Sequence, residues 1–565
     1  MMQLSRRQFL KVSAGTVAVA AIADKTLALT ALQPVVEVDN PLGEYPDRSW
    51  ERVYHDQYRY DSSFTWCCSP NDTHACRIRA FVRNGVVMRV EQNYDHQTYE
   101  DLYGNRGTFA HNPRMCLKGF TFHRRVYGPY RLKGPLMRKG WKQWMDDGSP
   151  ELTSDAKRKY KFDSRFLDDM VRVSWDTAFT YVAKGLIVIG TRYSGEAGAR
   201  RLREQGYAPE MIEMMKGAGV RTFKHRAGMP ILGMMGKHAN TRFNNCVLPL
   251  LDSWIRKVNP DQAQGGRYWN NYTWHGDQDP SQPWWNGTQN CDVDLSDMRF
   301  TKLNTSWGKN FVENKMPEAH WKLESMERGA RLVVITPEYN PTASRADYWI
   351  PVRPETDGAL FLGASKIILD ENYQDIDFIK GFTDMPLLVR TDTLQYLDPH
   401  EVLKDYRVPD FTKSYSGRVQ GLTQDQVQRL GGMMVWDLAK GKAVPLHREQ
   451  VGLHLAQSGI DPALTGTYRI KLLNGREVDV MPIYQLYTIH LQDYDLDTVH
   501  QVNRSPKDLI VRWARDCGTV KPAAIHNGEG VCHYFHMTSM GRAAALVMML
   551  TGNIGKFGTG CHTWS

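Results

Sequence analysis

Long apolar runs are scarce in this chain of 565 residues. The Ala-rich stretch Val12–Ala23 is only modestly apolar, and it is shorter than the roughly 20 residues that a membrane-spanning helix needs. No later stretch resembles a membrane span, and the sequence contains no internal repeat and no low-complexity segment. The chain is therefore expected to form several globular domains, and its attachment to a membrane would require a partner.

Cysteine pairs with disulfide-like spacing are also missing. The nine cysteines are an odd number at scattered positions, which argues against a disulfide framework. Cys-x2-Cys pairs, which hold zinc in many structural sites, do not occur either. The cysteines near the N-terminus therefore need an explanation other than disulfides or a zinc knuckle.

The N-terminus contains an export signal. Ser5-Arg6-Arg7-Gln-Phe-Leu-Lys11 matches the twin-arginine pattern, and the apolar stretch follows it. This route exports folded proteins, which suits a chain that acquires a cofactor in the cytoplasm. We expect a signal peptide over residues 1–28, cleavage near Thr26-Leu27-Ala28, and a periplasmic or equivalent extracytoplasmic location.

Three cysteines and an aspartate form a metal-binding pattern, Cys68-x3-Asp72-x3-Cys76 followed by Cys116. Thiolates select zinc or iron–sulfur clusters. The x3 spacing favours a [4Fe-4S] cluster, because each ligand must reach a different iron at a corner of the cluster. Two ligand sets fit the sequence. Either Asp72 is the fourth ligand, or Asp72 caps a turn and Cys67 supplies the fourth thiolate.

The net charge of +9 reflects in part a basic block that follows this pattern. Aromatic side chains interleave the block, as they do in nucleic-acid binding surfaces. An exported protein rarely meets nucleic acid, so a polyanionic cofactor or an acidic partner explains the charge better. The basic residues are His123–Arg125, Arg131, Lys133, Arg138, Lys139 and Lys142.

The first part of the chain is expected to be a small β-rich domain over residues 45–145. The sequence alternates between polar and apolar residues on both sides of Asn84-Gly85. This pattern predicts a β-hairpin with a type I′ turn. A helix is then expected to begin at Ser174 and to continue to Gly185.

The remainder, residues 165–565, is expected to form α/β domains. Short buried strands are predicted at Arg331–Pro337 and Pro522–Gly530, and an apolar helix through Ala543–Leu550 follows the second strand. Strands that alternate with helices form largely parallel sheets, which bind ligands at the carboxyl ends of their strands. The polar segment from about Asp398 to Gly466 is expected to be an insertion or a surface excursion.

Several longer phrases resemble the catalytic subunits of molybdopterin oxidoreductases of the dimethyl-sulfoxide-reductase superfamily. The resemblance is strongest to the branch of nitrite oxidoreductase and respiratory nitrate reductase alpha subunits. It implies the molybdopterin oxidoreductase fold, with a β-rich iron–sulfur domain before the α/β domains. The phrases are the twin-arginine leader, Ser69–Cys76, Cys116–Gly119, His123–Tyr130, Asn271–Gln278, Gly308–Asn310 and Asn314–His320.

The resemblance also implies residues that act at a metal. In this branch an aspartate coordinates molybdenum, and Asp277 occupies the matching position. A carboxylate suits a high-valent, oxygen-transferring metal. His275 and Asn71 match positions that line the substrate channel, although the related nitrate reductases carry a tyrosine where this chain has His275.

The cofactor that the resemblance implies is Mo-bis(molybdopterin guanine dinucleotide). Its phosphates, ribose and guanine require backbone amides at tight turns and a few carboxylates. Lys118 is expected between the cluster and one pterin. The other matching positions are Trp307, Gly308, Asn310, Pro337, Glu338, Asp347, Thr356, Asp357, Gly528, Glu529, His533 and His536.

The expected activity is interconversion of nitrite and nitrate by oxygen-atom transfer, with electrons relayed through the [4Fe-4S] cluster. The expected partners are an iron–sulfur beta subunit and a haem or membrane subunit. Reduction of selenate, chlorate or perchlorate shares the scaffold, and a non-catalytic iron–sulfur remnant is the alternative outside the enzyme class. Family members of this type are roughly twice as long, so the chain is expected to correspond to an N-terminal half that lacks the C-terminal capping domain. It would then be a fragment, the product of a split gene, or a degraded relative.

Overall fold

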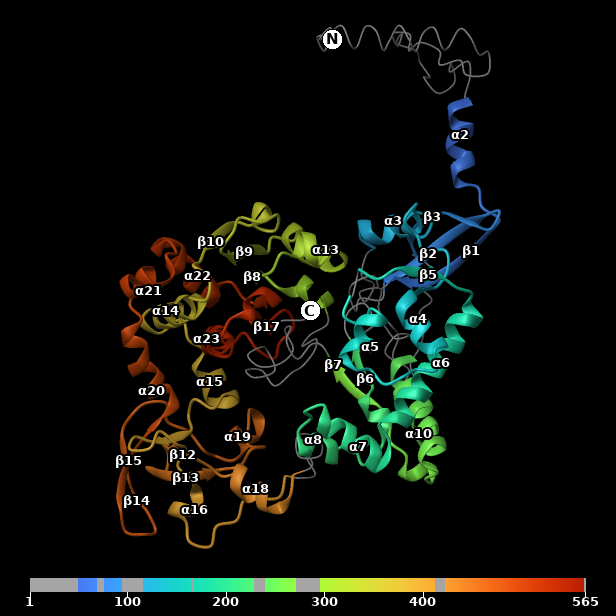
Figure 1. The fold of residues 1–565 in the computed structure, drawn as a ribbon. Coiled ribbons are helices and arrows are strands. Elements are labelled where there is room, and N and C mark those ends of the chain that lie inside the picture. Colours follow the sequence, from blue (N-terminus) through green and yellow to red (C-terminus); the bar gives the residue numbers. More distant parts are fainter. Residues whose placement is uncertain are drawn as a thin grey trace, which may run out of the picture. The chain divides into compact units, whose positions relative to one another are not determined.

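The structure is a computed structural model, and it describes residues 49–68, 76–93, 115–164, 167–227, 239–270, 295–411 and 422–562 (Figure 1). The expected signal peptide, residues 1–28, lies outside the described residues. Among the helices that are described, none combines the length and the apolar character needed to cross a bilayer.

The predicted hairpin is present at Asn84-Gly85. Both residues have positive φ angles, 50° and 77°, as a type I′ turn requires. The backbone N–H of Asn84 donates to Asp61 Oδ2 at 2.5 Å, and Arg83 pairs with Asp56 at 3.0 Å. The strands follow the order β1-β2-β3. The elements of this part are α2 (Ser49–Tyr58), β1 (Ser62–Cys68), β2 (Cys76–Arg83), β3 (Val86–Gln92) and α3 (Leu117–Val126).

A mainly helical segment follows. The helix predicted at Ser174 is confirmed, because Ser174 Oγ accepts a hydrogen bond from the Thr177 N–H at 3.1 Å. An N-cap of this kind satisfies one of the free amides of the first turn. The helix continues past Gly185 to Arg192. The elements are β4 (Leu136–Arg138), α4 (Lys139–Asp146), α5 (Ser154–Lys159), β5 (Met170–Arg172), α6 (Trp175–Arg192), α7 (Gly195–Glu204), α8 (Pro209–Glu213), β6 (Lys224–Ala227), α10 (Leu248–Arg256) and β7 (Arg267–Asn270).

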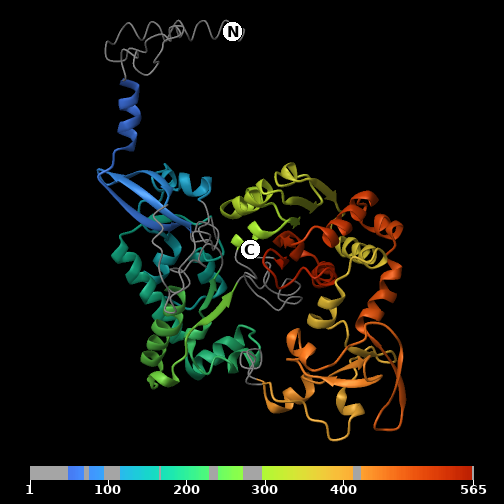
Figure 2. The same cartoon turned by 180° about the vertical axis from the view of Figure 1, so that it is seen from behind.

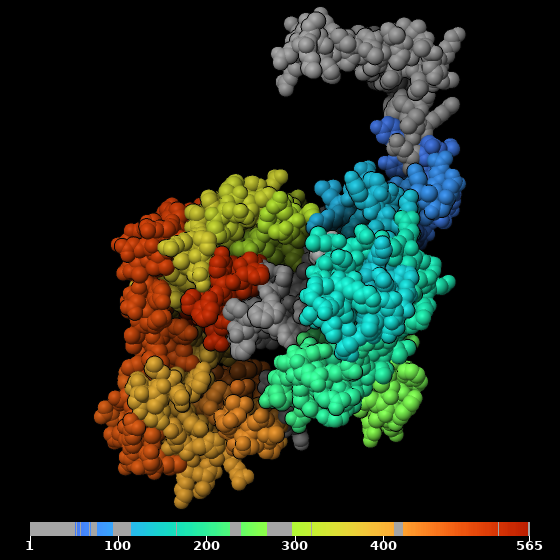
Figure 3. All heavy atoms as spheres, viewed as in Figure 1, coloured from blue at the N-terminus to red at the C-terminus, as the bar shows by residue number. Residues whose placement is uncertain are grey.

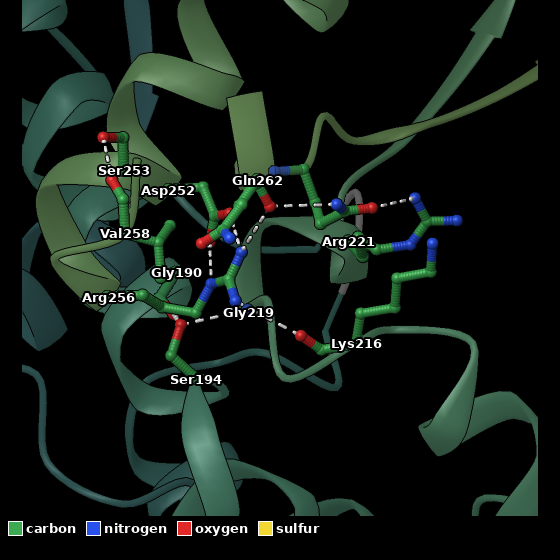
Figure 4. Close-up of polar contacts among 11 residues, drawn as sticks. Gly190, Ser194, Lys216, Gly219, Arg221, Asp252, Ser253, Arg256, Val258 and Gln262 are labelled. Carbon is green, nitrogen blue, oxygen red and sulfur yellow. Dashed lines mark hydrogen bonds and ion pairs between the residues drawn. The ribbon is translucent and has the colours of Figure 1, made fainter. Parts of the chain in front are cut away.

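A buried ion pair fastens the C-terminal end of α10 (Figure 4). Asp252 is fully buried, and it accepts hydrogen bonds from Arg256 Nε at 2.8 Å and from the Gln264 N–H at 2.7 Å. Arg256 also donates to the carbonyl oxygens of Lys216 and Gln262, each at 3.3 Å. One guanidinium therefore joins α10 to the loops on either side of it, and the carboxylate raises the pKa of Arg256.

The second half contains a five-stranded parallel sheet in the order β10-β9-β8-β16-β17. Strands from distant parts of the sequence lie side by side in it, as their yellow-green and red colours show in Figure 1. The predicted strands and parallel pairing are confirmed. The chain leaves β8 toward one edge and returns in β16 toward the other, so these two strands form the topological switch point. The strands are β8 (Leu303–Trp307), β9 (Arg331–Thr336), β10 (Tyr348–Pro351), β16 (Ala523–Asn527) and β17 (Gly560–His562).

Helices cover both faces of this sheet, as burial of a parallel sheet requires. On one face Trp307 packs edge-on against Phe361, which in turn packs against Trp513. On the other face Lys322 and Ser325 of α13 form hydrogen bonds to Ser306 and Asn304 of β8. The first face carries the main hydrophobic core, and the second carries buried polar contacts. The helices are α12 (Phe311–Asn314), α13 (Met316–Glu327), α14 (Asp357–Asp370), α15 (Ile376–Phe382), α22 (Lys507–Thr519) and α23 (Met537–Leu550).

Two small antiparallel sheets form a further group, orange in Figures 1 and 2. The polar composition of the segment 398–466 predicts an insertion or a surface excursion, but the segment also has an interior. Val435 pairs with Leu387 in an isolated bridge and is fully buried, and Met434 joins a second buried cluster. The strands are β11 (Leu388–Arg390), β12 (Met433–Asp437), β13 (Lys442–Leu446), β14 (Tyr468–Lys471) and β15 (Glu477–Pro482).

Candidate cofactor-binding crevice

Most of the predicted cofactor residues lie at the carboxyl ends of four parallel strands. Trp307 is the last residue of β8, and Gly308 and Asn310 follow it. Ligands of α/β proteins bind at this edge of the sheet, at the switch point. Pro337 and Glu338 follow β9, Thr356 and Asp357 follow β10, and Gly528, Glu529, His533 and His536 follow β16.

Two glycines meet where β8 and β16 end. The Gly528 N–H donates to the Trp307 carbonyl oxygen at 2.8 Å, and the Gly308 N–H donates to the Ile335 carbonyl oxygen at 2.9 Å. A Cβ on Gly528 would lie 2.0 Å from the Gly308 carbonyl oxygen, and Gly308 has a φ of +57°. Only glycine fits both positions, so the two strand ends form a narrow backbone cradle at the switch point.

A buried carboxyl lies next to this cradle. Trp307 Nε1 donates to Asp357 Oδ1 at 2.7 Å, and Asp357 is the first residue of α14. Burial raises the pKa of the Asp357 carboxyl, and the hydrogen bond from Trp307 opposes that rise. A buried acceptor at a strand end is suited to hold a polar ring or an amine.

The neighbouring residues are either more exposed or already hydrogen-bonded to other side chains. Asn310 Oδ1 accepts from Thr342 Oγ1 at 2.9 Å, and its Nδ2 donates to Glu313 at 2.6 Å. The side chains of Glu338, His533 and His536 are exposed. Red spheres of the C-terminal segment are visible at the surface in Figure 3. The side chain of Phe535, which lies between the two histidines in the sequence, is exposed as well.

The structure does not bring Asp347 to this edge. Asp347 directly precedes β10, and its Oδ2 accepts from the Leu332 N–H at 2.7 Å near the start of β9. At the same amino-terminal edge, Arg331 pairs with Asp516 at 2.6 Å and the Tyr348 hydroxyl donates to Asp516 at 2.7 Å. Asp347 therefore joins two neighbouring strands at this edge, and its contact with the nucleotide stays a prediction.

The predicted iron–sulfur ligands that are described lie at one end of the three-stranded sheet. Cys68 ends β1 and Cys76 begins β2, and both side chains are buried. Cys116 is the N-cap residue of α3. The adjacent Met115 N–H donates to Gln92 Oε1, at the end of β3, at 2.5 Å.

The ligand set itself remains a prediction. Asp72 and Asn71 lie outside the described residues, as does the side chain of Cys67. Within the described ranges, no three His, Cys, Asp or Glu side chains gather as a metal site would require. Lys118 is exposed in the first turn of α3. Asp277 and His275 lie in residues 271–294, which are not described either.

Three buried basic residues near the switch point were not identified from the sequence. Lys322 is 2% exposed, Lys309 is 5% exposed and His526 is 1% exposed. Lys322 occupies the inner face of α13, whereas the next residue, Leu323, is 41% exposed. Lys309 lies inside a phrase of the family resemblance, but only its neighbours were selected as cofactor residues. A lysine at an inward-facing helix position is the only signal that the sequence offers.

The chain is similar in sequence to the alpha subunits of several oxyanion reductases. It is 27% identical over 569 aligned residues to the perchlorate reductase subunit alpha of Dechloromonas aromatica, covering 100% of this chain and 52% of that protein. It is 28% identical to the respiratory nitrate reductase subunit alpha of Haloferax mediterranei, covering 96% of this chain and 46% of that protein. It is 26% identical to the chlorate reductase subunit alpha of Ideonella dechloratans, covering 98% of this chain and 50% of that protein. The chain thus spans about half the length of these relatives.

Two family models match the chain. The model of the twin-arginine translocation pathway signal sequence matches residues 3–23, so the predicted export signal is confirmed. The model of the molybdopterin oxidoreductases matches residues 131–564, which is more than half of the chain and includes the whole parallel sheet. The chain belongs to the molybdopterin oxidoreductase family.

Proposed function

We propose that this chain is the catalytic alpha subunit of an exported molybdenum oxidoreductase that interconverts nitrite and nitrate. The observation that carries the proposal is the family match over residues 131–564, which implies a molybdenum–molybdopterin cofactor. The similarity to alpha subunits of nitrate, perchlorate and chlorate reductases supports an oxyanion as the substrate. Reduction of chlorate or perchlorate is the second candidate, because relatives with those names align equally well.

The residues at the switch point fit such a cofactor. The cradle of Gly308 and Gly528 leaves no room for a Cβ, so the backbone can approach a phosphate or a ring closely. Asp357 places a buried acceptor beside the cradle. Both ring nitrogens of the buried His526 lack a hydrogen-bond partner among the described residues. The glycine cradle, the Asp357 carboxyl and the His526 imidazole together provide hydrogen-bond donors and acceptors for a polar, anionic group.

When bound, a molybdenum–molybdopterin cofactor supplies the two-electron redox chemistry. The chain's own contribution is binding, orientation and charge. We assign the phosphates of a guanine dinucleotide form to the backbone amides near Gly308 and Gly528. We assign its guanine to Asp357, whose carboxyl can accept from the N–H groups of the base. His533 and His536 follow the same strand and are candidates for contacts with the pterin.

The remaining assignments rest on the family resemblance. Cys68, Asp72, Cys76 and Cys116 would hold a [4Fe-4S] cluster that relays electrons, and Asp277 would bind molybdenum. The relatives are named as alpha subunits, so we propose an iron–sulfur beta subunit as a partner. The twin-arginine signal directs this chain to the periplasm or an equivalent compartment.

The test is metal analysis and turnover of the purified chain together with any subunits that copurify. The proposal predicts molybdenum, about four iron atoms per chain, and a higher kcat/KM with nitrate or nitrite than with chlorate or perchlorate. Asp277→Ala should remove molybdenum and turnover but retain iron, whereas the control Asp279→Ala should retain both. Preference for perchlorate would favour the second candidate. Iron without molybdenum, and no turnover of any oxyanion, would contradict both.

The fourth iron ligand has a separate test. If Asp72 is the ligand, Asp72→Cys should shift the reduction potential of the cluster, because a thiolate replaces a harder carboxylate. The matched variant Cys67→Ser should leave the potential unchanged. If instead Cys67→Ser destroys the cluster and Asp72→Cys has no effect, then Cys67 is the ligand.

A further inference from the structure

Helix α22 exposes one face that combines apolar surface with charges of both signs. Asp508, Val511 and Arg512 follow one another at intervals of three and one residues, which places them on one side of the helix. With Leu496, the first residue of α21 (Leu496–Asn503), they line a hollow of about 430 Å³. These four residues are called the α22 face below.

Three further charged residues line the same hollow, and each has a partner in its own chain. Lys507 forms an ion pair with Asp497. Arg515 donates to both carboxylate oxygens of Glu371, at 2.8 Å each. Asp516 is the buried acceptor already described at the amino-terminal edge of the sheet. The charges of these three residues are therefore balanced within the chain.

Asp508 and Arg512 are different, because neither has an ion-pair partner in the described part of the chain. Both side chains are exposed. Four residues separate them, a spacing at which two side chains can pair along a helix. Instead, the Arg512 guanidinium stacks on the ring of Tyr348, 4.1 Å from the ring centre. The Tyr348 hydroxyl is itself fixed by its hydrogen bond to Asp516, so Arg512 is held apart from Asp508.

The α22 face is complementary to itself. When two copies of a helix pack antiparallel about a two-fold axis, residue i of one copy lies opposite residue j of the other, and j opposite i. An axis at the level of Ile510, midway between the two charges in the sequence, sets each Asp508 against the Arg512 of the second copy. Val511 and Leu496 then supply apolar surface between the charged pairs, as the centre of a protein interface requires.

We propose that the α22 face binds a second copy of this chain, and that two reciprocal ion pairs between Asp508 and Arg512 fix the antiparallel register. Charge complementarity carries the proposal, because each copy offers an acid and a base where the other offers a base and an acid. A nucleic acid or an anionic membrane carries charge of one sign and would repel Asp508. Stacking on Tyr348 holds the guanidinium in place before binding, which reduces the entropy that pairing costs.

The position of the α22 face leaves the cofactor crevice free. Arg512 stacks on Tyr348, the first residue of β10, so the face lies at the amino-terminal edge of the sheet. The crevice lies at the carboxyl ends of the same strands. Two copies joined through α22 would therefore each keep an open crevice. The proposal goes beyond the proposed function and does not depend on molybdenum or turnover.

The experiment is sedimentation velocity of the full chain, with any subunits that copurify, over a range of concentrations. The wild type should change from one copy of the chain per particle to two as the concentration rises. Asp508→Arg should weaken the dimer at least about tenfold, because symmetry makes one substitution break both ion pairs. The matched control is Asp425→Arg, which should dimerise as the wild type does. Asp425 is an exposed acid at the second position of α18 (Gln424–Leu430), as Asp508 is in α22.

Exchanging the two charges separates specific pairing from a general effect of substitution. Arg512→Asp alone should also fail to dimerise, because acids then face acids. A mixture of Asp508→Arg with Arg512→Asp should form a dimer again, since every acid meets a base. The variant with both substitutions should dimerise with itself for the same reason. Both positions are exposed, so each variant should unfold at nearly the wild-type temperature.

Three results would overturn the proposal. The wild type could stay a single copy at every concentration, Asp508→Arg could dimerise as tightly as the wild type, or neither the mixture nor the double variant could restore the dimer. Loss of a copurifying subunit in Asp508→Arg, from a wild type with one copy per particle, would show that the face binds that subunit instead of a second copy. Because no turnover is measured, each of these outcomes is independent of the proposed activity.

Discussion

At the scale of single residues, the crevice depends on polar groups that are buried with few partners. One carboxyl oxygen of Asp357 accepts a hydrogen bond from the Trp307 side chain. Neither ring nitrogen of His526 has a hydrogen-bond partner among the described residues. Buried polar groups in native proteins nearly always have partners. Such groups cluster at functional sites, where a ligand completes them. These buried polar groups, together with the fold, mark the strand ends as a ligand site.

Asp357 gives the first prediction. Its pKa is raised in the folded chain, so the native state holds the proton more tightly than the unfolded state. Stability is then lost as pH rises from the unfolded pKa through the native pKa. The unfolding temperature of Asp357→Asn, relative to the wild type, should therefore increase between pH 4 and pH 7. Thermal unfolding followed by circular dichroism across this range measures the difference.

The control for this prediction is Asp357→Ala. Alanine removes the acceptor and leaves the buried Trp307 N–H unpaired, which costs about 1–3 kcal/mol. This variant should be less stable than Asp357→Asn at every pH. If the wild type and Asp357→Asn differ by a constant amount from pH 4 to pH 7, the pKa of Asp357 is not raised.

At the scale of elements, the junction of β8 and β16 is controlled by backbone contact. A Cβ on Gly528 would lie 2.0 Å from the Gly308 carbonyl oxygen, whereas a Cβ on Gly530 would lie 3.7 Å from the same atom. Gly528→Ala should therefore force the strand ends apart, at a cost of at least about 1–3 kcal/mol, and reduce the molybdenum content. Gly530→Ala is the matched control and should keep both stability and metal. Metal analysis of the two variants measures their molybdenum content, and thermal unfolding measures their stability.

The end of α10 gives a third prediction. Asp252→Asn removes the charge that pairs with Arg256, and the guanidinium is largely buried in a network that joins two loops. Loss of the pair should destabilise the protein by about 2–3 kcal/mol, seen as a lower urea midpoint for unfolding of this segment. Arg203→Ala removes a pair whose side chains are 53% and 81% exposed, and it should not change the midpoint measurably. Equal effects of the two variants would show that burial does not matter here.

Elements set by local chemistry could be predicted from the sequence, and those set by tertiary packing could not. Asn84-Gly85 specifies its turn because both residues tolerate positive φ. Ser174 marks a helix start because its hydroxyl reaches the third amide. Lys322 could not be placed, because its helix buries the lysine against Ser306 and exposes Leu323. The position of Asp347 at the amino-terminal edge of the sheet could not be predicted either, because a match in sequence does not show at which end of a strand a residue lies.

At the scale of the whole molecule, export and cofactor binding are connected through folding. The twin-arginine signal covers residues 3–23, and this route carries folded proteins. The parallel sheet is assembled from segments more than 200 residues apart, since Ala523–Asn527 pairs with Leu303–Trp307. Sheets with such distant pairings fold slowly. A chain of this kind benefits from completing its sheet before export.

The last prediction follows from this connection. Substituting both Arg6 and Arg7 by lysine should leave a folded chain in the cytoplasm, because the signal is altered while the sheet is intact. Gly528→Ala keeps the signal but disturbs the sheet where β8 meets β16, so it should also reduce export, whereas Gly530→Ala should be exported as the wild type is. Fractionation of cells, with protease resistance as the measure of folding, distinguishes the two causes. Normal export of Gly528→Ala in a protease-sensitive form would show that completion of this sheet is not required for transport.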